Sequence, residues 1–194
     1  MHAVLTELAE LTCAQCLRAL AEHRIQLERF LAMGRPLRFT TPQIEAPRWP
    51  SEDALLRIVA VAETFASGRL RSGQTAYMSG AGHSLTMWDA IVGKADHSWF
   101  SRDQVWKREF NVDLWQCPDY APFRGFVEAR NAVSHGIGYL TDQQLGRLSE
   151  VETYLKAADV EMEGRRVLFG DRHVEAASCI AIGFVKWLDF AAPF

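Results

Sequence analysis

The sequence predicts an all-α fold, a helical bundle with one small β-hairpin near the C-terminus. Long stretches of the chain carry apolar side chains at helical spacing, and two expected helices open with a Ser/Thr-x-x-Gln capping-box pattern. Residues 159–169 have the strand–turn–strand pattern of a hairpin, centred on Glu163-Gly164-Arg165. Because 194 residues can bury a sizeable core without metals or disulfides, we expect a single domain over residues 1–194.

Three long helices are expected, two in the N-terminal part of the chain and one at its C-terminal end. The first covers residues 3–33 and is stopped by Gly34 and Pro36. After a proline-rich loop, Ser51 has the position of an N-cap for the second, with two acids directly after it. Each helix has an apolar face that can pack against its neighbours. The apolar positions are, in order, Cys13, Leu17, Leu20, Leu27 and Leu31; Leu55, Val59, Ala62 and Ala66; and Val174, Ala177, Ala181, Phe184 and Leu188.

The middle of the chain is predicted to contain a loop and shorter helices. Residues 67–83 have loop composition, with four glycines and several serines, and a short helix is expected over residues 84–93. The capping-box pattern Ser101–Gln104 predicts a helix that runs towards Phe110. The aromatic side chains of this region favour core packing because they recur at helical spacing, although exposed rings can also stack on bases. They are Trp99, Phe100, Trp106, Phe110 and Trp115.

Two more helices are predicted before the hairpin. One is expected over residues 121–135, with Pro122 in its first turn and Gly136-Ile137-Gly138 at its end. A second capping-box pattern, Thr141–Gln144, predicts the next helix, which runs to about Lys156.

The overall composition excludes some classes of protein and leaves others open. The chain is 48% hydrophobic and 23% charged, as in ordinary globular domains. Its net charge is −3, so any RNA contact has to come from a local patch rather than from an overall positive field. No apolar run approaches the ~18 residues of a membrane span, and the N-terminus lacks the pattern of a signal peptide. We therefore expect a cytoplasmic protein that does not contact membranes.

The cysteines and histidines do not have the spacing of a metal site. Cys13 and Cys16 form a CxxC inside an expected helix, without the second Cys pair or nearby His of a zinc site. The hypothesis of a metal hydrolase using His23, His83 or His97 lacks ligand spacing of the HExxH kind. We therefore expect core cysteines in a reducing compartment, with neither a metal nor another cofactor.

The candidate functional residues lie near the end of the helix expected over residues 121–135. Arg130 follows Phe126 by four residues and therefore continues the apolar stripe of this helix. A guanidinium removed from water needs a partner to offset its desolvation. Asn131 is adjacent, and His135 lies one turn beyond Asn131.

Helix geometry limits how these three side chains can meet. Arg130 and His135 diverge by about 140° on an ideal helix, so we expect the arginine's reach and unwinding at Gly136 to bring them together. Histidine exchanges protons near neutral pH, which suits His135 for acid–base work. The alternative interpretation is that the three side chains cap helix carbonyls and anchor the following loop.

The segment from Phe126 to Gly136, FVEARNAVSHG, resembles the signature of HEPN domains, written R-x(4–6)-H with Asn commonly after the Arg. Its setting is also similar: it lies late in a helical domain of this size, after an aromatic-rich helix and before a capped helix. The hairpin and the closing amphipathic helix resemble one branch of the family. The resemblance covers most of the chain, with its sharp matches confined to residues 126–136.

The resemblance implies a HEPN-like bundle that forms a homodimer and places two Arg-Asn-His sets in a shared cleft. It implies a metal-independent endoribonuclease of the toxin–antitoxin or antiviral defence kind, with room for an antitoxin or regulatory partner. When the roles of the family's residues are transferred by position, His135 is the acid–base residue and Arg130 clamps the phosphate and the transition state. Asn131 is then the orienting residue. RNA cleavage through the 2′-OH needs one proton removed and another delivered, while a planar cation stabilises the phosphorane.

Some expectations of the resemblance are open. In the branch paired with small nucleotidyltransferase antitoxins, a Tyr stands two residues after the His, whereas this chain has Ile137 there and Tyr139 as its nearest tyrosine. Some HEPN proteins lack nuclease activity, so a non-catalytic HEPN interaction or scaffolding module is the alternative function. The candidates for further RNA contacts, with solvated surface charge as their alternative role, are Arg124, Arg147, Arg69 and Arg71.

Overall fold

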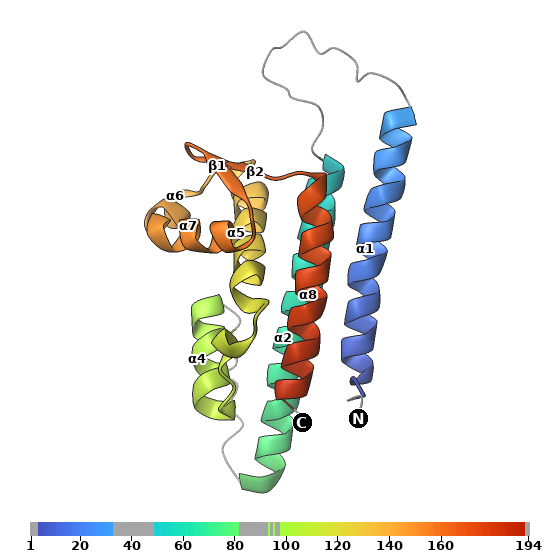
Figure 1. Ribbon diagram of the computed structural model, residues 1–194. Coiled ribbons are helices and arrows are strands. Elements are labelled where there is room, and N and C mark those ends of the chain that lie inside the picture. The colour runs from blue at the N-terminus through green and yellow to red at the C-terminus, as the bar shows by residue number, and fades with distance from the viewer. Residues whose placement is uncertain (1–3, 33–48, 82–92, 94, 96–97, 193–194) are drawn as a thin grey trace.

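Helices form most of the computed structural model, which describes residues 4–32, 49–81, 93, 95 and 98–192 (Figure 1). Its elements are α1 (Glu7–Ala32), α2 (Trp49–Ala81), α4 (Trp99–Phe110), the 3-10 helix η1 (Leu114–Gln116), α5 (Tyr120–Gly136), α6 (Asp142–Leu145), α7 (Leu148–Ala157), β1 (Glu161–Glu163), β2 (Arg166–Leu168) and α8 (Asp171–Ala191). The predicted all-α fold with one hairpin near the C-terminus is confirmed. No helix among these described residues is long and apolar enough to cross a membrane. The helix expected over residues 84–93 falls almost entirely outside the described residues.

The three long helices α1, α2 and α8 run side by side as a three-helix bundle, in which each packs against the other two (Figure 1). The apolar positions predicted for α2 and α8 are all buried. On α1 the prediction was partly wrong, because Leu17 and Leu31 are exposed. The buried stripe of α1 consists mainly of small side chains, including Ala9, Cys16 and Ala19, which let its backbone approach the other two helices.

Helix α2 is longer than the sequence predicted. The predicted loop over residues 67–83 is wrong for its described part, because α2 continues to Ala81. Leu70 is buried, and a Cβ on Gly68 would lie 3.4 Å from a methyl of Leu8 on α1. Close packing of α2 against its neighbours therefore outweighs the cost of about 1 kcal/mol that each helical glycine carries.

The starts of two helices also differ from the predictions. Helix α2 begins at Trp49, so Ser51 is not its N-cap. Instead, the Ser51 hydroxyl donates to the Asp171 carboxylate at 2.5 Å and links α2 to α8. Helix α4 begins at Trp99, and its N-cap is Ser98, whose side chain accepts from the Ser101 backbone N–H.

An aromatic cluster joins α4 and α5 to the bundle of long helices. Phe123 of α5 stacks on Phe184 of α8, with ring centroids 4.6 Å apart and planes at 10°. The Trp99 ring meets Phe123 edge-on at 5.2 Å. The predicted core role is confirmed for Trp99 and Trp106, which are buried. It is wrong for Phe100 and Trp115, which are exposed.

Helices α5 and α7 pack with their backbones in close contact. A Cβ on Gly125 would lie only 2.2 Å from the Tyr154 carbonyl oxygen, so this position excludes any larger residue. The capping box of Thr141 and Gln144 is confirmed, with both of its hydrogen bonds present. The single helix predicted beyond it is broken at Gly146-Arg147 into α6 and α7. Arg147 therefore lies directly before the helix that packs on α5.

The predicted hairpin is confirmed and anchors the segment that follows α5. Strands β1 and β2 are antiparallel, with Met162 paired to Val167. Tyr139 forms a β-bridge with Arg166, and the Leu140 N–H donates to the Arg165 carbonyl at 2.8 Å. These bonds fix the chain just beyond the end of α5.

Three of the four cysteines are buried free thiols, as expected, while Cys179 is exposed. Burial raises the pKa of Cys16 to about 12 and the pKa of Cys117 to about 11. Both thiols therefore stay protonated at neutral pH, whereas a metal ion binds the thiolate. Within the described ranges, no group of three or more His, Cys, Asp or Glu side chains is placed to hold a metal ion.

Candidate functional site

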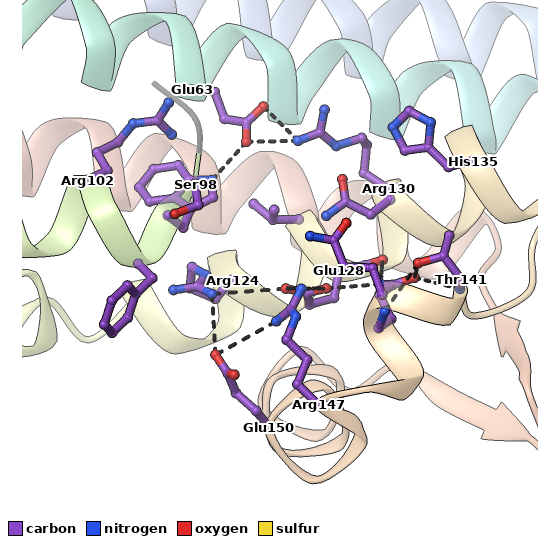
Figure 2. A pocket seen from close by; sticks show the side chains of 16 residues that line it. Glu63, Ser98, Arg102, Arg124, Glu128, Arg130, His135, Thr141, Arg147 and Glu150 are labelled. Carbon is purple, nitrogen blue, oxygen red and sulfur yellow. Dashed lines mark hydrogen bonds and ion pairs between the residues drawn. The ribbon is translucent and has the colours of Figure 1, made fainter. Parts of the chain in front are cut away.

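Arg130, Asn131 and His135 border one cavity of about 890 Å³, here called the Arg130 cavity (Figure 2). Its wall also includes side chains from α2, α4 and the segment 141–150. Helix α5 stays regular through Gly136, so the unwinding that we expected does not occur. The three side chains reach the same cavity because it extends along one side of α5 and because the arginine side chain is long.

Arg130 is held by a carboxylate from a distant part of the chain. Its Nη2 donates to both carboxylate oxygens of Glu63 on α2, each at 2.8 Å, and both side chains are largely shielded from water. The Trp99 indole N–H donates to the same carboxylate at 2.8 Å. Figure 2 shows the Glu63 carboxylate facing the Arg130 guanidinium. Glu63 is the partner that an arginine in line with an apolar stripe requires.

The sequence contained a signal for Glu63 that we missed. Glu63 follows Val59 by four residues and precedes Ala66 by three, so it lies in the apolar register of α2. A carboxylate in such a register needs a cation or several donors when the helix packs. Glu63 and Arg130 interrupt the apolar faces of α2 and α5, which pack against each other.

His135 lies in the last turn of α5 and its side chain is exposed. The C-cap of α5 is Ile137, which adopts the left-handed conformation with φ 53° and ψ 45°. The N–H groups of Ile137 and Gly138 both point back to the Ala132 carbonyl. Glycine is the usual residue in this conformation, so a β-branched Ile137 beside His135 is a strained position. The imidazole thus lies at the C-terminal end of α5, two residues before this left-handed cap.

A second ionic cluster forms another wall of the cavity around the buried Glu128. Its carboxylate accepts two hydrogen bonds from Arg147 Nη2, at 2.9 and 2.8 Å, and one from the Gln144 amide at 2.9 Å. Arg124 lies 4.0 Å from the same carboxylate. A buried carboxylate costs folding free energy unless such donors surround it. Glu128 thereby fixes the segment around α6 against α5.

Arg124 is a buried side chain rather than a surface charge. Its guanidinium lies 4.5 Å from the ring centroid of Tyr154 and pairs with Glu150 at 3.7 Å. Burial raises the pKa of the hydroxyls of both Tyr154 and Tyr120, which also contacts Arg124, so both rings are neutral. Arg124 and Arg147 thus border the Arg130 cavity, but each is engaged with glutamates.

The other two arginines that we considered for RNA contacts do not border the Arg130 cavity. Arg69 is buried between α2 and α8, where it lies 3.5 Å from the Asp189 carboxylate and donates to the Ala192 carbonyl. Arg71 is an exposed side chain further along α2. A residue that we did not consider, Arg102 of α4, does border the cavity. Its guanidinium lies 4.4 Å from the Trp99 ring, and it donates to the Ser67 hydroxyl at 3.3 Å.

The cavity wall combines charges with neutral polar groups. It contains four arginines and three glutamates, so its formal charge exceeds zero by one before His135 is counted. The amides of Asn131, Gln143 and Gln144 add hydrogen-bonding groups. This arrangement offers a phosphate contact and an acid–base group in one place. Comparison with family models, with curated proteins and with solved structures found no match for this chain.

Proposed function

We propose that the protein is a HEPN-type endoribonuclease of the toxin or defence kind that cleaves RNA through the 2′-OH, without a metal ion. One observation carries the proposal: Arg130 and His135, which diverge along α5, border the same cavity together with Asn131. The R-x4-H spacing within FVEARNAVSHG supports the same assignment. An arginine and a histidine are the two groups that this chemistry needs most.

The reaction can be written with these side chains in named roles. The 2′-oxygen attacks the adjacent phosphorus and loses its proton, while the bond from phosphorus to the 5′-oxygen breaks and that oxygen gains a proton. The products are a 2′,3′-cyclic phosphate and a 5′-OH end. His135 carries one of the two protons. Arg130 stabilises the negative charge that develops on the phosphorane oxygens, and Asn131 orients the phosphate.

The chemistry also supports a homodimer as the working form. One imidazole cannot remove a proton from the 2′-oxygen and deliver another to the 5′-oxygen at the same time. A second copy that places its own His135 at a shared cleft supplies the other proton carrier. An antitoxin or regulatory partner that covers this cleft is part of the same proposal.

The second candidate function is a non-catalytic interaction or scaffolding module. One observation favours it: Arg130, Arg124 and Arg147 are already paired with Glu63, Glu128 and Glu150. Such pairs stabilise a fold in the absence of any substrate. In this alternative, Arg130 is kept because its loss leaves Glu63 as a shielded charge without its cation.

Incubation of the protein with total RNA in EDTA tests the nuclease proposal. We expect the wild type to cleave RNA and to leave 2′,3′-cyclic phosphate ends. His135→Ala is expected to lower the rate by about 10²–10⁴-fold, because proton transfer in the transition state contributes that much. The readouts are fragment analysis on denaturing gels and end-group analysis of the products.

Two further variants make this experiment decisive. Ser134→Ala changes the exposed neighbour of His135 and is expected to keep full activity. Arg130→Ala is expected to lose activity while its thermal unfolding shows a folded protein. If the wild type leaves all RNA substrates intact and Arg130→Ala mainly lowers stability, the interaction module is the better assignment.

A further inference from the structure

A second hollow, here called the Trp115 groove, adjoins the Arg130 cavity. It has a volume of about 670 Å³ and is bordered by Trp115, Leu148 and Tyr154, among others. Arg147 and Glu150 border both hollows, so the two share a wall. In Figure 2 these two side chains lie at the edge of the cavity, on the side of α7. A molecule bound along this wall can therefore reach both hollows.

Trp115 is an exposed ring that is nevertheless held in a fixed orientation. Its side chain is 53% exposed. The indole N–H donates to the Asp103 carboxylate at 3.3 Å, and the Trp115 backbone N–H donates to Asp113 at 3.2 Å. The ring is nearly parallel to Tyr154, at 6.1 Å and 23°, and perpendicular to Tyr120 at 5.3 Å. A large ring fixed by three contacts loses little conformational entropy when a flat ligand stacks on it.

We propose that the Trp115 groove binds a nucleobase of single-stranded RNA by stacking, next to the nucleotide whose phosphate occupies the Arg130 cavity. This inference rests on the proposed nuclease function and adds a substrate subsite to it. Every base has a flat π-face, so an indole takes any base, while the shared Arg147 attracts the phosphate between the two nucleotides. The exposed Ser149 and Thr153 provide hydroxyls along the same groove.

The proposed ligand follows from what surrounds the ring. An apolar peptide side chain would also cover Trp115, but the wall towards the Arg130 cavity is ionic, and it carries Arg147 with a third of its side chain exposed. A base with its attached phosphate matches this arrangement, in which an aromatic surface lies next to a cationic one. Bases inside a duplex are stacked on each other and cannot reach the indole. The groove therefore selects single strands.

Binding of an uncleavable ligand tests the groove separately from catalysis. The probe is a fluorescein-labelled 2′-O-methyl RNA oligonucleotide of mixed sequence, whose attacking oxygen is blocked, followed by fluorescence anisotropy. We expect Trp115→Ala to raise its Kd by about 5- to 150-fold, which corresponds to the 1–3 kcal/mol that base stacking contributes. Trp115→Phe, which keeps a flat ring, is expected to recover most of the affinity, whereas Trp115→Leu is not. The same oligonucleotide annealed to its complement is expected to bind weakly and to be indifferent to Trp115.

The controls separate this inference from the nuclease proposal. Phe190→Ala removes another exposed aromatic side chain, on α8, that borders neither hollow, and this variant is expected to bind as the wild type does. If Trp115→Leu and the wild type bind equally while total RNA is still cleaved, the stacking subsite is wrong and the nuclease stands. If Trp115→Ala weakens self-association in light scattering and leaves RNA affinity unchanged, the groove is a protein interface and the inference is overturned. If the wild type neither binds the oligonucleotide nor cleaves RNA, both proposals are wrong.

Discussion

Glu63 has two opposite effects on Arg130. Its carboxylate orients the guanidinium, and it also occupies donors that a phosphate needs. Both hydrogen bonds to Glu63 come from Nη2. A guanidinium presents five donors in a rigid fork, and because Nε is buried, Nη1 is the nitrogen that can address a phosphate without breaking the pair. If Arg130 clamps a phosphate as we propose, Glu63 acts as a positioning residue. Its carboxylate also accepts a hydrogen bond from the Trp99 indole N–H.

Replacement of Glu63 tests the positioning role. We expect Glu63→Ala to lower kcat by about 10²-fold with a smaller change in KM, because a misplaced clamp mainly weakens the transition state. Glu63→Gln keeps an acceptor of the same length and is expected to recover part of kcat. Steady-state kinetics on a short RNA measures both constants. Glu152→Gln, a change at an exposed glutamate of α7, is the matched control. An increase in activity on removing Glu63 would show instead that it competes with the phosphate.

At the level of single residues, the sequence predicts what lies within one helix better than what meets across helices. Arg130, Asn131 and His135 could be selected because their spacing along α5 is visible in the chain. Glu63 lies 67 residues from Arg130, and no spacing rule connects them. Arg124 and Arg147 were interpreted as candidate RNA contacts or surface charges, and only the packing of α5 on α7 shows that Glu128 and Glu150 hold them.

At the level of elements, the end of α5 controls the position of His135. The glycine-rich stretch Gly136-Ile137-Gly138 was correctly predicted to end the helix, but the left-handed residue that caps it is Ile137. Gly138 follows with φ 84°, and both N–H groups satisfy the Ala132 carbonyl. The strain of a β-branched residue is thus located two positions after the proposed acid–base residue.

Substitutions at this helix end have opposite expected signs. Ile137→Gly is expected to raise the free energy of unfolding by about 1 kcal/mol, because it removes left-handed strain and loses little packing. The side chain of Ile137 is 90% exposed in the single copy. Gly138→Ala places a side chain at φ 84° and is expected to lower the free energy of unfolding by a similar amount. Urea unfolding measures both. If Ile137→Gly destabilises the protein, its side chain must pack against another chain.

The errors in predicting the elements have a common physical cause. Composition indicated a loop over residues 67–83, yet Gly68 packs against Leu8 of α1 and the helix continues. Conversely, helical spacing after Thr141 predicted one helix, and the chain breaks at Gly146-Arg147. In both cases contacts with distant elements outweigh local preference. The capped or strongly periodic segments, such as α5, α8 and the hairpin, were predicted well because local and tertiary preferences agree there.

At the level of the whole molecule, the candidate site lies where α5 packs against the bundle of long helices. Helix α2 of that bundle contributes Glu63, and α5 contributes Arg130. The wall is completed by Arg147 and Glu150 at the start of α7. Because the Arg130–Glu63 ion pair joins α5 to α2, this wall of the cavity forms only where the two helices are packed together. In the reaction that we propose, each copy supplies a single His135 to the cavity, and the second proton transfer is assigned to a partner copy.

A mixing experiment tests the proposed homodimer, in which two copies of His135 carry the two protons. We expect light scattering to give about 44 kDa, twice the 21.9 kDa of one chain. Subunit exchange with an excess of inactive His135→Ala places nearly every wild-type chain beside a copy without an imidazole. If two imidazoles act in one cleft, the activity of the wild-type chains falls in proportion to the share of mixed dimers, about tenfold at a ninefold excess. If each copy cleaves alone, their activity is unchanged, as it should be after addition of an unrelated protein. A folded His135→Ala chain that dimerises without inhibiting would assign both proton transfers to groups within one copy, and Glu63 would then be the first carboxylate to examine.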